Sequence, residues 1–593
     1  MQNNQKYLDE LRHSAAHLLA AAILELWPEA KPTIGPPIED GFYYDFDFAR
    51  PISEADLPKI EKKMGEIIPT WKEFVRTEVT ADEARAIFKS NPYKLELIDE
   101  IAAKGEKLTI YSSAPLSKPY TLSPKPFADL CRGGHVENPS KELKAFKLIS
   151  LAGAYWRGDE KNRMLTRIYG TAFPAKEELA AHLAMLAEAK RRDHRKIGKE
   201  LDLFAFSDLV GPGLPLFTPK GTRIRQGLEN FIGELREAAG FERVWIPHIA
   251  KNELYKTSGH WEKFEDDIFH VKSKKTETGF VIKPMNCPHH TQIFAAQPRS
   301  YKDMPIRYFE TTTIYRDENT GQLQGLSRVR SITQDDSHVF CRPDQVEEEA
   351  RISQKLITAL YDAIGIKLKI RLSTHDPEKM EKYLGTEKSW REAEQKLESM
   401  LKKDGREYFI GLGEAAFYAP KIDYIGIDSL GREWQLATIQ LDTNQPHRFG
   451  LSYINEKGEK EEPVMIHVAV MGSTERFMAI LIEHFAGAFP AWLAPEAVRV
   501  VPISEKFADY ADKVRQTLQA ARVSATLDDS NETLGKRIRG GEKQKIPYLL
   551  IVGDKEEKAG SVNIRKRGEK DQREEKLADF VKRIVTEISQ KQL

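Results

Sequence analysis

Apolar and polar residues recur with different periods along the chain, and these periods predict its main elements. Near the N-terminus, "LRHSAAHLLAAAILEL" places Leu11, Ala15 and Leu18 near one face of a predicted helix. Residues 175–203 form a long charged stretch with helical character, which the glycines and prolines of "GPGLPLFTPKG" bring to an end. After residue 498, short apolar strands alternate with helical stretches, a pattern that favours a small α/β domain.

The order of these elements predicts an α+β protein with several domains, because 593 residues are too many for one hydrophobic core. We expect a first α/β domain at 1–172, a linker helix at 173–203, a large mixed domain at 204–490 and a small α/β domain at 491–593.

The stretch "SITQDDSHVFC" (331–341) has the pattern of a strand, yet it carries several polar groups. Because strand side chains alternate between faces, Gln334, Asp336 and His338 share one face, and Asp335 points to the other. An amide, a carboxylate and an imidazole in one row are typical of the floor of a site. A hydrogen-bonded polar strand at an interface would also account for this pattern.

Two other stretches of the middle domain supply possible metal ligands beside His338. "KPMNCPHH" contains Cys287, and "PVMIHVAV" contains His467. Zinc accepts three protein ligands of nitrogen and sulfur type and leaves a fourth position open in functional sites. The three residues are widely dispersed, so their spacing alone does not reveal such a site.

The first domain holds a second cluster of possible ligands. "HSAAH" places His13 and His17 on one face of the predicted helix, and "CRGGH" adds Cys131 and His135. These atoms suit a zinc site. A pair of surface histidines and a buried cysteine is the alternative interpretation.

Several arginines lie at the predicted ends of strands and helices. "YFETTTIYRDENTGQLQGLSRVRSITQDDSH" has the pattern strand, loop, strand, with Arg316 after the first strand and Arg328 and Arg330 before the second. In "MGSTERFMAILIEHFAG", Arg476 lies in the first turn of a predicted helix, where phosphates bind. Arginine forks match phosphate oxygens. An ordinary hairpin and a core helix remain the alternatives.

Composition narrows the class of protein. Hydrophobic residues make up 40% and charged residues 30%, as in soluble globular proteins, and no apolar run is long enough to cross a membrane. The three cysteines fit a reducing cytoplasm, and the N-terminus lacks the features of a signal peptide. Lys plus Arg (90) equals Asp plus Glu (90), so any contact with nucleic acid depends on local basic patches such as "KRRDHRK".

The two arginine-bearing stretches together resemble motifs 2 and 3 of class II aminoacyl-tRNA synthetases. "GTRIRQGLENFIGELREAAGFERVWIPHI" resembles motif 1, which builds the dimer interface in that family. With "KPMNCPHH", "TQDDSH", "FYAPKID" and "VMIH", the similarity narrows to the threonyl-tRNA synthetases and covers nearly the whole chain. It implies an editing domain, a catalytic domain built on an antiparallel sheet and an anticodon-binding domain, in that order, in a cytoplasmic homodimer.

The resemblance implies ATP-dependent ligation of L-threonine to threonine tRNA through threonyl-adenylate, with Mg²⁺ accompanying ATP. It implies one zinc ion per subunit, held by Cys287, His338 and His467, with the amino and hydroxyl groups of threonine completing the coordination. Valine lacks the hydroxyl group, and a polar site left unsatisfied rejects such an analogue strongly. Serine has both groups, so the family hydrolyses mischarged seryl-tRNA in a second site.

The resemblance also assigns roles to single residues of the catalytic domain. Arg316 matches the contact to the α-phosphate of ATP, Arg476 the contact to the γ-phosphate, and His260 a histidine that helps to move the aminoacyl group onto tRNA. Further ATP contacts match Glu318, Arg328 and Gln440. The threonine pocket matches Gln334, Asp336, Tyr418 and Lys421.

The outer domains have matching positions too. In the family the editing residues position water and substrate without a metal, whereas their residue types alone suit zinc. The editing positions are His13, His17, Asp129, Cys131 and His135. Base-contacting positions of the anticodon domain match Glu556 and Arg565.

The sequence departs from the family at several points. Relatives usually begin with a ubiquitin-like domain, which we expect to be missing here, and Gly134 stands in place of a usual proline. Asn319 and Gln324 replace the usual proline and histidine of the motif 2 loop. Three alternatives stay open: an RNA-binding paralogue that has lost activation, another class II synthetase such as the prolyl type, and an active enzyme without editing.

Overall fold

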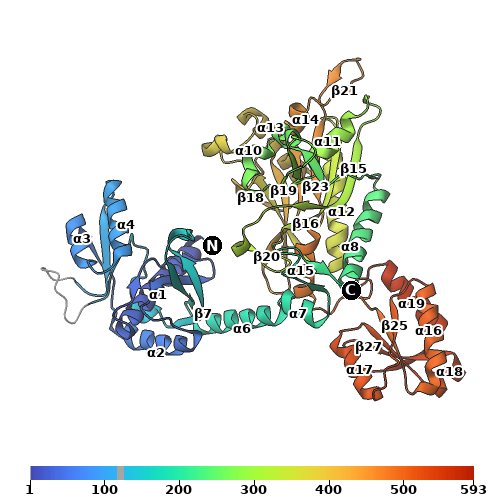
Figure 1. Ribbon diagram of the computed structural model, residues 1–593, viewed down its shortest axis with the longest axis horizontal. Coiled ribbons are helices and arrows are strands. Elements are labelled where there is room, and N and C mark those ends of the chain that lie inside the picture. The colour runs from blue at the N-terminus through green and yellow to red at the C-terminus, as the bar shows by residue number, and fades with distance from the viewer. Residues whose placement is uncertain (1, 116–125, 570) are drawn as a thin grey trace. The chain divides into compact units, whose positions relative to one another are not determined.

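A computed structural model describes residues 2–115, 126–569 and 571–593, and the chain forms two units, Met1–Ala187 and Glu188–Leu593 (Figure 1). Within the described residues, we find no helix with the length and apolar character needed to span a membrane.

The first unit is built around an antiparallel sheet with strand order β1-β3-β8-β7, in which β2 also pairs with β3. Helices α1 and α2 pack against each other and against this sheet. Leu11, Ala15 and Leu18 of α1 are fully buried, as the helical spacing predicts. A smaller sheet, β4-β5-β6, carries α3 and α4.

The elements of this unit have the following bounds. The helices are α1 (Gln2–Leu26), α2 (Leu57–Ile67), α3 (Ala81–Ile87), α4 (Pro92–Ala103) and α5 (Pro139–Glu142). The strands are β1 (Lys31–Pro32), β2 (Pro37–Ile38), β3 (Gly41–Asp47), β4 (Val75–Val79), β5 (Leu108–Ser112), β6 (Ala128–Leu130), β7 (Ala145–Tyr155) and β8 (Met164–Phe173).

The stretch after β8 forms two helices, α6 (Lys176–Arg192) and α7 (His194–Glu200). The prediction of one linker helix over 173–203 is therefore wrong in this respect. Asp193 interrupts the helix with φ −46° and ψ 121°, and its side chain accepts a hydrogen bond from the Arg195 N–H at 2.8 Å. This is the geometry of a helix N-cap, which competes with continuation of the preceding helix.

The second unit contains an eight-stranded sheet with the order β11-β15-β16-β23-β20-β19-β17-β18. Its inner pairs are antiparallel, and only the outermost pairs, β11–β15 and β17–β18, are parallel. The strands are β11 (Glu242–Arg243), β15 (Ile306–Tyr315), β16 (Ser331–Cys341), β17 (Lys367–Thr374), β18 (Tyr408–Leu412), β19 (Lys421–Ile427), β20 (Glu433–Asp442) and β23 (Val464–Ala469).

Helices cover this sheet because its strands alternate apolar side chains between two faces. On β16, Val339 and Cys341 join the core formed with α8, α12, α13 and α15, while Phe340 packs with α11 on the other face. The helices are α8 (Pro219–Ala238), α9 (Asn252–Ser258), α10 (His260–Phe264), α11 (Cys287–Ala295), α12 (Val346–Ile364), α13 (Glu387–Lys403), α14 (Asn444–Arg448) and α15 (Thr474–His484).

The C-terminal part forms a five-stranded mixed sheet with the order β25-β24-β26-β27-β28, coloured orange to red in Figure 1. Its core is apolar and includes Val500, Leu550 and Phe580. Its elements are β24 (Val498–Pro502), α16 (Ala508–Ala520), β25 (Ala525–Leu527), α17 (Leu534–Lys543), β26 (Tyr548–Val552), α18 (Asp554–Ala559), β27 (Ser561–Lys566), β28 (Arg573–Lys576) and α19 (Leu577–Ser589).

Candidate functional site

Polar side chains form a row across four neighbouring strands of the large sheet. His338 on β16 pairs with His467 on β23, His467 pairs with Gln440 on β20, and Gln440 pairs with Lys421 on β19. Residues in register across adjacent strands point to the same face. The buried carboxylate of Asp336 lies two residues from His338, on that same face. The alternation expected for 331–341 is therefore observed.

Cys287, His338 and His467 come together although they are far apart in the sequence. Their possible ligand atoms all lie within 4.8 Å of one another, and all three side chains are buried. Nε2 of His338 lies 3.0 Å from Nδ1 of His467. Two nitrogens bound to one tetrahedral zinc ion would be about 3.3 Å apart. The site is therefore close to the dimensions that zinc requires.

Two further side chains orient the imidazoles. Oδ2 of Asp442 lies 2.9 Å from Nε2 of His467, and Nδ1 of His290 lies 2.8 Å from Nδ1 of His338. A carboxylate on the far nitrogen of a histidine is a common support for a metal ligand. Neither Asp442 nor His290 was predicted from the sequence. Asp442 follows Gln440 by two positions on β20, and His290 lies one turn after Cys287 on α11.

The donor chemistry also fits zinc. Burial raises the pKa of the Cys287 thiol well above its usual value, and burial lowers the pKa of His338 well below its own. The imidazole is thus neutral and able to bind a metal, whereas the thiol needs a nearby cation to lose its proton. Three buried nitrogen and sulfur donors with supported orientations match a zinc site that has an open position.

Residues predicted to line an amino-acid pocket lie on the same strands as these side chains or in contact with them. Burial raises the pKa of Asp336 to about 6, and its Oδ2 accepts a hydrogen bond from Asn286 at 3.1 Å. The Tyr418 hydroxyl donates to Oε1 of Gln440 at 2.7 Å, and its ring centroid lies 5.1 Å from that of His467. Nζ of Lys421 lies 3.0 Å from a carboxylate oxygen of Asp423.

His260 is also brought to this centre. Its Nε2 lies 3.8 Å from Sγ of Cys287, and its Nδ1 lies 2.8 Å from Oγ of Ser258. Burial lowers the pKa of His260 to about 3, so its ring is neutral at physiological pH.

Gln334 forms a backbone bridge to Ser473, which ties β16 to the start of α15.

Two arginines in this unit are held without an acidic partner. Burial lowers the pKa of both Arg316 and Arg476, and among the described residues neither forms an ion pair. The guanidinium of Arg476 lies 5.5 Å from the centre of the Trp434 ring. Arg328 instead pairs with Glu318 at 2.6 Å. Arg316 is partly buried near the carboxylates of Glu318 and Asp267, whereas Arg476 is exposed. A guanidinium without a direct acidic partner is suited to an anionic ligand.

The histidines of α1 meet Cys131 and His135 in the first unit. Sγ of Cys131 lies 3.5 Å from Nε2 of His13 and 3.3 Å from Nε2 of His135, and the ligand atoms of all four residues, His17 included, lie within 4.8 Å of one another. Nδ1 of His17 lies 3.3 Å from Oδ2 of Asp129. The structure therefore gathers all five predicted editing residues.

The residues of this cluster shift one another's pKa values. Burial would raise the pKa of Cys131, but hydrogen bonds from His13, His135 and His17 lower it to about 3. Burial disfavours the charged form of His17, but Asp129 stabilises it, and the net effect raises the pKa of His17 to about 9. Burial and neighbouring positive charges lower the pKa of His135 to about 4.

Two buried partners of Asp129 were not predicted from the sequence. Lys94 and Tyr44, both nearly fully buried, contact the Asp129 carboxylate. Burial would raise the pKa of Asp129, but the positive charges of Lys94 and His17 lower it. Lys94 lies on α4 and Tyr44 on β3, and no local sequence pattern connects them to Asp129.

The remaining predicted residues are less closely grouped. Glu556 accepts the Gly553 N–H at 2.9 Å and so caps α18, while Arg565 on β27 lies 3.6 Å from Glu542. In the described part of the chain, no hydrogen bond or ion pair joins Glu556 to Arg565. Gly134 has φ +84°, which a proline cannot adopt, and its carbonyl oxygen lies 3.1 Å from Nδ1 of His13.

Comparison with known proteins gives consistent matches along the chain. Residues 269–485 match the family "tRNA synthetase class II core domain (G, H, P, S and T)", and 497–587 match "Anticodon binding domain". Residues 120–169 match "Threonyl and Alanyl tRNA synthetase second additional domain". Part of this last match lies outside the described residues.

Individual relatives agree with these matches. The threonine--tRNA ligase of Rubrobacter xylanophilus is 49% identical over 582 residues, which cover 98% of this chain and 89% of that protein. The enzyme of that name from Staphylococcus carnosus is 47% identical and covers 98% of this chain and 88% of its own. The crystal structure of the RNA binding domain of threonyl-tRNA synthetase from Cryptosporidium parvum matches with a TM-score of 0.64 at 36% identity, covering 66% of this chain and 98% of that one.

The antiparallel sheet and the matched domains define a class II aminoacyl-tRNA synthetase with an anticodon-binding domain and an editing-type domain. Within that class, the chain belongs to the threonine--tRNA ligase family.

Proposed function

We propose that this chain activates L-threonine with ATP and Mg²⁺ to threonyl-adenylate and transfers the threonyl group to threonine tRNA. The observation that carries this proposal is the buried set of Cys287, His338 and His467 beside Asp336. We assign the activation reaction to the domain at 204–490, editing to 1–172 and anticodon binding to 491–593.

Cys287, His338 and His467 would hold one zinc ion per subunit. When bound, zinc would offer open positions to the amino and hydroxyl groups of threonine. The Asp336 carboxylate receives the amino group, and Gln334, Tyr418 and Lys421 line the rest of the pocket. Valine cannot satisfy a polar site that expects a hydroxyl group, so the pocket discriminates against it.

Arg316 and Arg476 bind the phosphates of ATP. Neither guanidinium group forms an ion pair among the described residues, so both can supply positive charge where negative charge develops as the threonine carboxylate attacks the α-phosphate. Glu318, Arg328 and Gln440 make further contacts to ATP. His260, neutral and near the metal ligands, assists the transfer of the threonyl group to the tRNA ribose.

The first unit hydrolyses mischarged seryl-tRNA. Serine carries the same amino and hydroxyl groups as threonine, so a first site built on those groups admits it. His13, His17, Asp129, Cys131 and His135 position the seryl ester and a water molecule. Glu556 and Arg565 contact anticodon bases.

Two copies of the chain form the enzyme. The segment after α8 ends at Pro247 and resembles the family's dimer-building motif. Trp245 in this segment is 77% exposed and Ile249 is 50% exposed. These exposed apolar side chains, four positions apart in the resembling segment, support an interface with a second copy of the chain.

The test is aminoacylation of threonine tRNA by the full chain, followed by incubation of separately prepared seryl-tRNA with the same protein. We expect threonylation that depends on ATP, and release of serine faster than release of threonine. A folded protein that binds tRNA but joins no amino acid to it would instead support a paralogue that has lost activation.

A further inference from the structure

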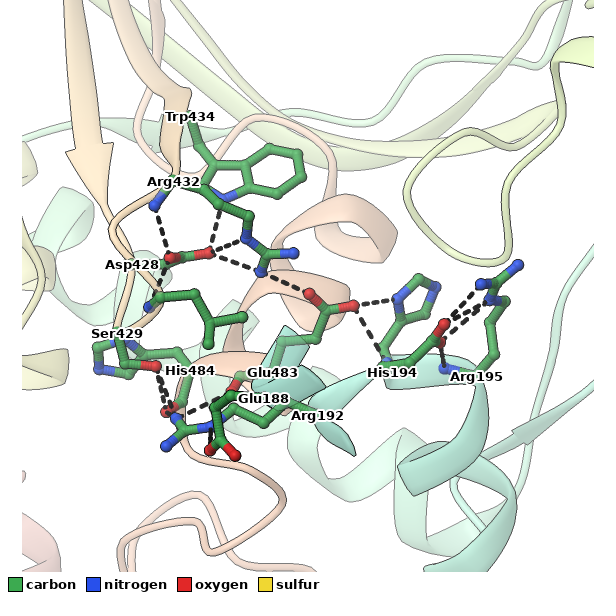
Figure 2. A network of polar contacts seen from close by, with 12 residues as sticks. Glu188, Arg192, His194, Arg195, Asp428, Ser429, Arg432, Trp434, Glu483 and His484 are labelled. Atoms are coloured by element: carbon green, nitrogen blue, oxygen red, sulfur yellow. Dashed lines mark hydrogen bonds and ion pairs between the residues drawn. The ribbon is translucent and has the colours of Figure 1, made fainter. Parts of the chain in front are cut away.

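His194, the first residue of α7, uses both of its ring nitrogens inside the second unit (Figure 2). Nδ1 lies 2.7 Å from Oε1 of Glu483, which also accepts the backbone N–H of His194 at 3.1 Å. Nε2 accepts the backbone N–H of Leu326 at 3.1 Å. Because Nε2 is the acceptor, the proton lies on Nδ1 and is donated to Glu483. The side chain is 3% exposed.

The contact at Leu326 reaches the loop between β15 and β16, which carries Arg316 and Arg328. Gly325 precedes Leu326 and has φ +50°. A Cβ at Gly325 would collide with Nε2 of His194. The loop therefore passes directly over the imidazole ring, at a distance that only glycine permits.

On the other side of Glu483, a series of contacts leads to Arg476. Glu483 also accepts a hydrogen bond from Arg432, and Nε of Arg432 donates to Oδ2 of Asp428 at 2.7 Å. Trp434 donates to the same oxygen at 2.9 Å, and its ring lies against the guanidinium of Arg476 at 5.5 Å. Figure 2 shows Glu483 between His194 on one side and Arg432 on the other.

The end of α6 is fixed to the same place. Nη1 of Arg192 donates to Oγ of Ser429 at 2.7 Å and to the carbonyl oxygen of His484 at 3.1 Å. The junction between α6 and α7 is thus bound to the end of α15 and to the turn between β19 and β20.

Asp193, His194 and Glu483 also lie close enough to hold a cation. The hydrogen bonds argue against that use, because both nitrogens of His194 are occupied and Asp193 binds Arg195. The cluster therefore acts through its contacts to Leu326 and Arg432.

We propose that His194 is a positioning residue for ATP. Through its Nε2 it fixes the loop that follows Arg316, and through Glu483, Arg432 and Trp434 it supports the orientation of Arg476. The proposal rests on the proposed function, in which both arginines bind ATP. It also makes the start of α7 part of the ATP site, although His194 does not touch the nucleotide.

Two substitutions separate the two bonds of the imidazole. In His194→Gln the amide oxygen can replace Nε2 as acceptor for Leu326, and in His194→Asn the amide nitrogen can replace Nδ1 as donor to Glu483. For His194→Asn we expect the KM for ATP in ATP–pyrophosphate exchange to rise about tenfold, with the KM for threonine unchanged. A tenfold change corresponds to about 1.4 kcal/mol, which lies within the range that one hydrogen bond contributes. His194→Gln keeps the contact to Leu326 but loses the bond to Glu483, so we expect a smaller rise in the KM for ATP, of about threefold.

A matched pair of glycine variants tests the loop itself. Gly325→Ala should raise the KM for ATP as His194→Asn does, because the new methyl group displaces the loop from the imidazole. Gly321→Ala lies in the same loop, where a Cβ would meet nothing within 4 Å, and should leave that KM unchanged.

The outcomes are distinguishable. If the wild-type protein exchanges no amino acid, the proposed function is wrong and this inference falls with it. If the wild type is active and His194→Asn, His194→Gln and Gly325→Ala share its KM for ATP, only the positioning role is wrong. Equal increases in the KM for ATP and for threonine would also overturn it, because they indicate general damage. Should the His194 variants fail to fold, the two glycine variants decide.

Discussion

At the scale of single residues, the surroundings give identical side chains different chemistry. Burial raises the pKa of the Cys287 and Cys341 thiols, whereas three histidines around Cys131 lower its pKa to about 3 despite burial. Cys131 is also the only one of the three cysteines that is not fully buried. The surroundings therefore favour a thiolate at Cys131 and disfavour one at the two buried cysteines, unless a metal ion binds Cys287.

This difference predicts selective alkylation. Above pH 3 Cys131 is already ionised, so its rate of reaction with iodoacetamide should change little between pH 5 and 7. An ordinary thiol, with a pKa of about 8.5, reacts about tenfold faster for each unit of pH in that range. Mass spectrometry of the labelled peptide measures the rate, and Cys131→Ser is the control. A tenfold rise per pH unit at Cys131 would contradict the proposed thiolate.

The two buried cysteines of the large domain give a second residue-scale prediction. Cys287→Ala should lose bound zinc and reduce threonine activation by at least about a hundredfold, since loss of a ligand or of its support weakens metal binding strongly. Cys341→Ala is a matched control, because Cys341 is equally buried but packs in the core on the opposite face of the sheet. It should keep both zinc and activity. Full zinc content in Cys287→Ala would refute the ligand assignment.

At the scale of elements, β16 carries a carboxylate with structural partners on one face and a carboxylate of the proposed site on the other. Asp335 is fully buried, pairs with Arg236 of α8 and accepts the backbone N–H groups of Val470 and Met471 at 2.8 Å. Asp336 faces the polar row instead. Of these two neighbouring carboxylates, Asp335 thus has structural partners, and Asp336 faces the proposed threonine site.

Asp335→Asn should lower the free energy of unfolding by about 3–5 kcal/mol, because it leaves the Arg236 charge buried and unpaired. Asp336→Asn should leave the unfolding temperature nearly unchanged and raise the KM for threonine more than tenfold. Thermal unfolding and exchange kinetics of the two variants measure both effects. The assignment of faces would be wrong if Asp335→Asn were as stable as the wild type.

Strand periodicity correctly predicted which residues of 331–341 share a face, because alternation is a local property of the backbone. The supports of the site could not be predicted in this way. Asp442 reaches His467 through the register of β20 and β23, and Lys94 reaches Asp129 through the packing of α4. The break at Asp193 was hidden because charged helix-forming residues stand on both sides of it. The only indication of this break in the sequence was Asp193 itself, an acidic residue of a type that often caps a helix.

At the scale of the whole molecule, activation and editing are assigned to two separate units of one chain. His13→Ala should therefore leave threonine activation unchanged and slow the deacylation of seryl-tRNA by at least tenfold, since a positioned acid–base or binding group contributes factors of this size. Both assays are made on the same preparation. If His13→Ala cleared seryl-tRNA as fast as the wild type, the editing role of this cluster would be wrong.

We propose above that a zinc-holding site selects threonine by its hydroxyl group. The most direct measurement is ATP–pyrophosphate exchange with threonine, serine, valine and proline, with zinc content determined on the same sample. We predict about one zinc ion per chain, strong exchange with threonine, weaker exchange with serine and almost none with valine or proline. If folded, zinc-loaded protein exchanged none of the four amino acids, or accepted valine as well as threonine, this mode of selection would be wrong.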